Sequence, residues 1–140
     1  MTALQLAAGL NFIGAALHLV VIWWGPDGYR FFGAGEQMAQ MAERKNPWPA
    51  ILTLLITAVL AVWGLYCLAL DGYFPELPWT SQIVIVITAV YIVRGIYPLL
   101  LSPFVAIFRT PFMIWSSLIC TGFGVVHLVG VWPVLDSVLS

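Results

Sequence analysis

Four long runs of apolar residues, separated by short segments that hold nearly all of the charge, constrain this chain more than any other feature. The runs cover residues 4–24, 49–70, 83–101 and 112–134. A helix needs about 20 apolar residues to cross the hydrocarbon core of a bilayer, and each run is close to that length. Charged residues make up only 8% of the chain, against roughly 25% in a soluble domain. The sequence therefore predicts an all-α membrane protein, a four-transmembrane-helix bundle that forms one integral membrane domain over residues 1–140.

The segment 25–48, between the first and second runs, is too long for a simple turn. Within it, the stretch GEQMAQMAERK places Met38, Met41 and Ala42 on one helical face and mostly polar residues on the other. We expect a short amphipathic helix that lies in the plane of the membrane interface. Two roles stay open for this segment: a connector that seals one end of the bundle, or a lid over a site.

Basic residues outside the runs are confined to the first and third connecting segments. They are Arg30, Arg44, Lys45 and Arg109. Because short loops rich in Lys and Arg stay in the cytoplasm, the sequence predicts a multi-pass membrane protein with both termini on the opposite side, which is the periplasm if the membrane is a bacterial inner membrane and a lumen otherwise. Five Lys and Arg residues in total are too few for a surface that neutralises phosphates, so no nucleic-acid partner is expected.

Arg94, in the stretch YIVRGIYP at residues 91–98, is the one charge inside a predicted span. A charge at the centre of a bilayer costs at least about 2.5 kcal/mol and usually faces the protein interior or a cavity. Pro98 has no N–H to pair with the carbonyl of Arg94, and Gly95 loosens the same turn, so we expect a kink there. These features predict a polar pocket on the cytoplasmic side. Its candidate ligand-binding residues are Arg94, Tyr91, His18, Glu36, Asn11 and Thr57.

The partner of Arg94 is left open by the sequence, because no acidic residue lies within a span. The candidates are a carboxylate of segment 25–48 (Asp27, Glu36 or Glu43) or a bound carboxylate or phosphate. Alternatively, the side chain snorkels toward the headgroups.

Two similar strings, HLVVIW at 18–23 and HLVGVW at 127–132, are either a coincidence or an inverted repeat of the kind found in some transporters. Because the two spans are expected to run in opposite directions, His18 is predicted near the cytoplasmic face of the membrane and His127 near the outer face. This disfavours a metal or haem shared between them within one chain, while a haem that bridges two copies of the chain stays open. We expect both histidines to be neutral and hydrogen-bonded to a neighbouring helix. Cys67 and Cys120 lack a C-x-x-C spacing, and no metal or cofactor is predicted.

Three stretches resemble a group of small, uncharacterised four-transmembrane bacterial inner-membrane proteins. They are GPDGYRFFGAGEQMA at 25–39, AVYIVRG at 89–95 and WSSLICTGFGVVHLVG at 115–130. The resemblance implies the same architecture and location, and it carries no activity and no catalytic residue.

The function favoured by these residues is binding of an anionic amphiphile or lipid headgroup around Arg94. Three alternatives stay open: a membrane enzyme with His18 or Glu36 as general acid or base, a structural or assembly subunit, and a small transporter. The expected partners are membrane lipids and, through the small-residue faces of the helices, a second copy of the chain.

Overall fold

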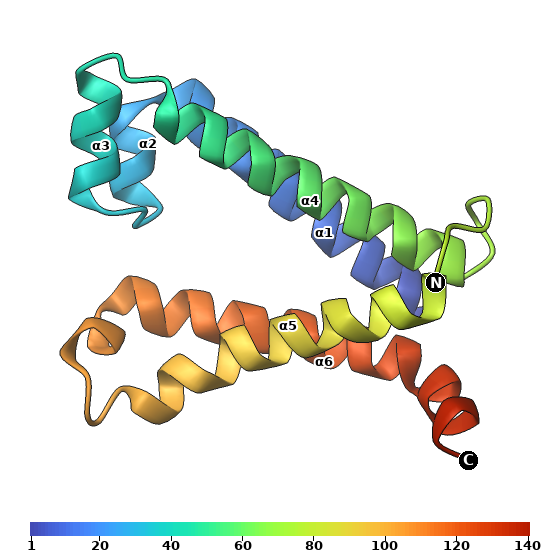
Figure 1. Ribbon diagram of the computed structural model, residues 1–140. Coiled ribbons are helices and arrows are strands. Elements are labelled where there is room, and N and C mark those ends of the chain that lie inside the picture. The colour runs from blue at the N-terminus through green and yellow to red at the C-terminus, as the bar shows by residue number, and fades with distance from the viewer. The chain divides into compact units, whose positions relative to one another are not determined.

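The computed structural model describes residues 1–140 and is built of helices, without a strand (Figure 1). The helices are α1 (Ala3–Trp24), α2 (Pro26–Phe31), α3 (Glu36–Glu43), α4 (Trp48–Leu70), α5 (Thr80–Leu101), the 3₁₀ helix η1 (Ala106–Arg109) and α6 (Pro111–Leu139). Of these, α1, α4, α5 and α6 are long and apolar enough to cross a membrane. The predicted all-α class with four long apolar helices is confirmed, and the chain is a multi-pass membrane protein.

Two helices begin at prolines. Pro111 occupies the first turn of α6, where Thr110 accepts a hydrogen bond from the backbone N–H of Met113 at 3.3 Å. Pro26 likewise lies in the first turn of α2, because its fixed φ suits a helix start and its missing N–H would be unpaired there anyway. The stretch GPDG therefore ends α1 and also starts the short helix α2.

The chain forms two compact units, and the first contains Met1–Leu10 together with Trp63–Ser140. All four long helices contribute to the core of this unit. Its buried members are Leu4, Ala7 and Ala8 from α1, Cys67 from α4, Val84 from α5 and Val131 from α6. Ala7, Ala8 and Cys67 are small, which lets the helices approach closely; in lipid, helix association depends on such packing because burial of apolar surface gives no driving force. The predicted four-helix bundle is present in this unit.

Within the same unit, α5 and α6 pack closely at two glycines. A Cβ atom on Gly95 would lie 2.8 Å from Cα of Thr121, and one on Gly124 would lie 2.7 Å from Cγ1 of Ile92. Gly95 therefore serves the contact between the helices, as expected for the small-residue face of this span. The helix α5 continues through the buried Pro98 to Leu101.

The second unit, Asn11–Val62, has its own small core at the end of α1. Val21 of α1, Tyr29 of α2 and Ala39 of α3 are buried there. The polar side of α3 is exposed, including Glu36 and Glu43. The predicted amphipathic helix between the first two spans is thus confirmed as α3, with Ala39 as its most buried residue.

Candidate functional site

Arg94 is held on α5 by two hydroxyl groups of α6. Its Nη1 donates to Oγ of Ser117 at 3.3 Å, and its Nη2 donates to Oγ of Ser116 at 3.2 Å. Ser116 in turn donates to the carbonyl of Met113 at 3.3 Å, so its oxygen is free to accept from the guanidinium. Both partners are neutral, and no carboxylate of this unit pairs with Arg94. The guanidinium is therefore oriented by α6, and its charge is not neutralised there.

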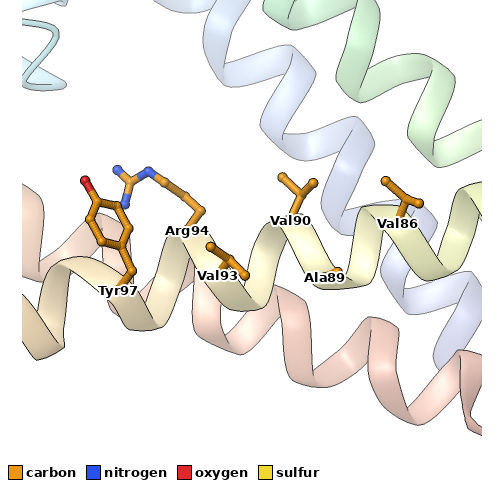
Figure 2. A pocket seen from close by; sticks show the side chains of 6 residues that line it. All are labelled: Val86, Ala89, Val90, Val93, Arg94 and Tyr97. Atoms are coloured by element: carbon orange, nitrogen blue, oxygen red, sulfur yellow. The ribbon is translucent and has the colours of Figure 1, made fainter.

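An open groove of about 450 Å³ runs along one face of α5 and ends at Arg94 (Figure 2). Its lining residues recur at intervals of three and four, which places them on one side of a helix. They are Val86, Ala89, Val90, Val93, Arg94 and Tyr97. The surface of the groove is almost entirely apolar, because Arg94 and Tyr97 contribute to it mainly through carbon atoms. The guanidinium of Arg94 lies beside one end of this apolar surface (Figure 2).

Tyr97 is held at that end by a neighbouring ring. Its ring centroid lies 5.3 Å from that of Phe108 in η1, in an edge-to-face arrangement with an interplanar angle of 77°. Such aromatic pairs prefer this geometry. Tyr97 and Arg94 are three residues apart, so α5 presents a hydroxyl and a guanidinium together.

Tyr91 lies on another side of α5 and is buried among aromatic rings. The ring centroids of Trp63, Phe123 and His127 lie 5.4, 5.5 and 4.9 Å from that of Tyr91. Tyr91 does not line the groove of Arg94. It joins α4, α5 and α6 in the four-helix unit, which indicates a packing role.

The other predicted site residues belong to the unit Asn11–Val62. Nδ1 of His18 lies 2.7 Å from the carbonyl oxygen of Gly14, and Oγ1 of Thr57 donates to the carbonyl of Thr53 at 2.9 Å. Asn11 is fully buried. That His18, Asn11, Thr57 and Glu36 share a site with Arg94 stays a prediction.

Each histidine contacts a carbonyl oxygen of its own helix through Nδ1. The predicted bond of His127 to a neighbouring helix stays a prediction. Nδ1 of His127 lies 2.7 Å from the carbonyl oxygen of Phe123. Nδ1 of His18 lies at the same distance, 2.7 Å, from the carbonyl oxygen of Gly14. In each case the acceptor is four residues earlier, because the helix leaves that carbonyl within reach of the ring. The matching strings therefore share a local geometry, and an inverted repeat stays a prediction.

Glu36 is bound by Arg30. Nε of Arg30 donates to Oε2 of Glu36 at 3.0 Å and Nη2 to Oε1 at 2.8 Å, while Nη2 also lies 2.6 Å from Oε1 of Glu43. The hydrogen bonds from Arg30 hold the pKa of Glu36 below its ordinary value, and those to Glu36 raise the pKa of Arg30 further above the physiological range. Asp27 lies 3.6 Å from Nη1 of Arg30. The three carboxylates of segment 25–48 that were candidate partners of Arg94, namely those of Asp27, Glu36 and Glu43, thus contact Arg30.

From their positions in the sequence, Ser116 and Ser117 were expected at a depth similar to that of Arg94, but their hydrogen bonds to Arg94 were not predicted. Tyr97 was not singled out by the sequence. No group of three or more His, Cys, Asp or Glu side chains lies close enough together to hold a metal ion.

Comparison of the chain with protein-family models, with curated proteins and with solved structures found no match. The role of the site is therefore inferred from its own geometry.

Proposed function

We propose that this membrane protein binds an anionic amphiphile, such as a fatty acid or an anionic lipid. The acidic headgroup contacts Arg94, and the hydrocarbon chain lies along α5. The observation that carries the proposal is a guanidinium held by two neutral hydroxyls at the end of an apolar groove. A headgroup oxygen supplies the negative charge that Arg94 lacks within its unit.

The position of Arg94 supports this assignment energetically. Arg94 is seven residues from Leu101, the end of α5, which is about 10 Å along a helix. A charge at this depth is costly, and neutral hydrogen bonds only partly offset the loss of water. An acidic headgroup forms a charge-assisted and geometrically specific pair with a guanidinium. The bound anion therefore stabilises a charge that the membrane otherwise penalises.

The groove also matches the other part of an amphiphile. Val86, Val90 and Val93 give it an apolar wall, and the distance along the helix from Val86 to Arg94 is about 12 Å. A hydrocarbon chain contacts this wall while its head reaches Arg94 and the hydroxyl of Tyr97. A free inorganic anion would leave the apolar wall unused.

We also propose that the protein resides in a bacterial inner membrane with both termini in the periplasm. All cations outside the long helices lie between α1 and α4 or between α5 and α6. With four crossings these two segments are on one side, which the distribution of Lys and Arg assigns to the cytoplasm. Arg94 then opens toward the cytoplasmic leaflet.

A structural role for Arg94 is the second candidate, and the same hydrogen bonds favour it, because they tie α5 to α6. The enzyme alternative has less support: Glu36 is engaged by Arg30, and His18 is bonded within its own helix. A ligand-binding Arg94 and a structural Arg94 differ in what copurifies with the protein.

Native mass spectrometry of the purified protein tests the proposal. The wild type is expected to retain fatty acid or anionic lipid, and Arg94→Ala is expected to lose it. Arg94→Lys keeps the charge without the planar donor pair and should retain less than the wild type. Arg109→Ala removes an exposed cation outside the spans and serves as the matched control, with retention unchanged. Equal retention by the wild type and Arg94→Ala would refute the proposal.

A further inference from the structure

We infer that a second site, between the start of α1, the end of α4 and the C-terminal half of α6, binds an organic ammonium group through Asp71. This site does not depend on the proposed function of Arg94. It uses a pocket of about 360 Å³ in the four-helix unit. Three helices line it, whereas the groove of Arg94 lies on α5 alone.

The carboxylate of Asp71 is oriented by two neutral donors. Oδ1 accepts a hydrogen bond from the hydroxyl of Thr2 at 2.9 Å, and Oδ2 accepts one from the side-chain amide of Gln5 at 2.9 Å. No cationic group pairs with Asp71. A carboxylate has about four acceptor positions, so two remain for a ligand. Both oxygens are thus fixed in place while the negative charge stays unpaired.

The walls around this carboxylate are apolar. Leu4 of α1, Leu70 of α4 and Val129 and Pro133 of α6 line the pocket. Gly130 brings α6 against α1, because a Cβ atom there would lie 2.9 Å from Cγ of Leu4. A metal ion or a small hydrated cation would leave these walls unused. The combination of one anionic group and apolar walls fits an ammonium that carries a hydrocarbon arm.

The location of Asp71 fits a ligand that comes from the lipid–water boundary. Asp71 directly follows the last residue of α4, and Tyr73 and Trp79 in the same loop are 73% and 76% exposed. Exposed Tyr and Trp side chains are typical of the interface. Two kinds of ligand at the lipid–water boundary carry a primary ammonium group: an aminophospholipid, in its headgroup, and a free alkylamine.

Binding of hexylammonium, followed by ligand-observed NMR in a neutral glycoside detergent, tests the site. The wild type is expected to bind hexylammonium and to show no binding of hexanol. Asp71→Asn removes the charge and should bind at least about tenfold more weakly, as loss of one charge-assisted hydrogen bond implies. Glu76→Gln removes an equal charge from the same loop, at an exposed residue outside the pocket, and should bind like the wild type.

A second variant covers the case in which Asp71→Asn unfolds. Val129→Trp fills the pocket from an exposed position and leaves the carboxylate and its donors in place, and it should also weaken binding. Native mass spectrometry distinguishes the sources: retention of phosphatidylethanolamine by the wild type but not by Asp71→Asn indicates the lipid, and binding of hexylammonium without such retention indicates a free amine. Equal affinity of the wild type and Val129→Trp, or equal binding of hexanol and hexylammonium, would overturn the inference.

Discussion

Arg94 of α5 donates a hydrogen bond to the fully buried Ser117 of α6 across 3.3 Å. The donor carries a full charge, and the acceptor is a neutral hydroxyl. In a water-poor environment such a pair fixes the position of the guanidinium without compensating its charge. This mismatch is the basis for assigning a ligand to Arg94, and it separates a binding role from a purely structural one.

Replacing Arg94 with Met tests this mismatch through stability. Methionine fills a similar volume without a charge, so the penalty for an uncompensated charge in a span disappears. In lipid-free detergent, Arg94→Met should leave the free energy of unfolding unchanged or raise it by about 1–3 kcal/mol. Unfolding in SDS, followed by tryptophan fluorescence, measures the difference. A purely structural Arg94 predicts a loss of stability, because two bonds between α5 and α6 vanish.

The close contact of α5 and α6 predicts opposite results for two glycines. Gly95→Ala places a Cβ atom 2.8 Å from Cα of Thr121 and should lower the free energy of unfolding by about 1–3 kcal/mol, because the backbones must separate. Gly122 on α6 has no atom within 4 Å of such a Cβ, so Gly122→Ala should be neutral or slightly stabilising. The SDS unfolding assay measures both. Equal effects would show that the contact at Gly95 is not tight.

The contact between Arg30 of α2 and Glu36 of α3 predicts that the stability of this pair of helices depends on pH. The folded-state pKa of Glu36 is lowered from 4.5 by its hydrogen bonds from Arg30. The stabilisation is therefore fully present above this value and is lost as the pH falls through the lower, folded-state pKa. The Nε–H signal of Arg30 in NMR should be constant from neutral pH down to about 4.5 and should shift below it. Glu36→Gln should reduce this transition while the contact of Glu43 with Arg30 remains in place, and Glu76→Gln should preserve it; a midpoint above 4.5 would contradict the contact.

Membrane orientation is tested by labelling single cysteines with an impermeant maleimide, in a background with Cys67→Ala and Cys120→Ala. In intact bacterial cells, Ser140→Cys should react, because the C-terminus is proposed to be periplasmic. Asn46→Cys, an exposed position next to Arg44 and Lys45, should react only after the inner membrane is permeabilised. The reverse pattern would place the Arg94 groove in the periplasmic leaflet.

The four long helices were predictable from the sequence because a membrane span is defined by length and apolar content. The residues at which these helices begin and end were less predictable. The helix α5 begins at Thr80, ahead of the apolar run at residue 83, and α6 continues past Pro133 to Leu139. Helical hydrogen bonding does not stop where hydropathy falls. The short helix α2 was missed because Gly and Pro also mark turns.

The site was only partly predictable. Arg94 was identified because a charge within an apolar run is rare, but its contact with Ser116 and Ser117 depends on how α5 and α6 are rotated about their axes. Apolar residues surround both helices, so hydropathy does not fix that rotation. The bonds of His18 and Thr57 to their own helix were missed for a different reason. A polar side chain in a span can bond locally as well as to a neighbouring helix.

The identity of the atoms next to the Arg94 guanidinium tests the central claim most directly. An experimental structure of the wild type in lipid nanodiscs that contain anionic lipid would show them. We predict an acidic oxygen of a lipid or fatty acid within about 3 Å of a guanidinium nitrogen, with Ser116 and Ser117 still accepting from the other side. A carboxylate of the chain itself at that position, or only water, would contradict the account.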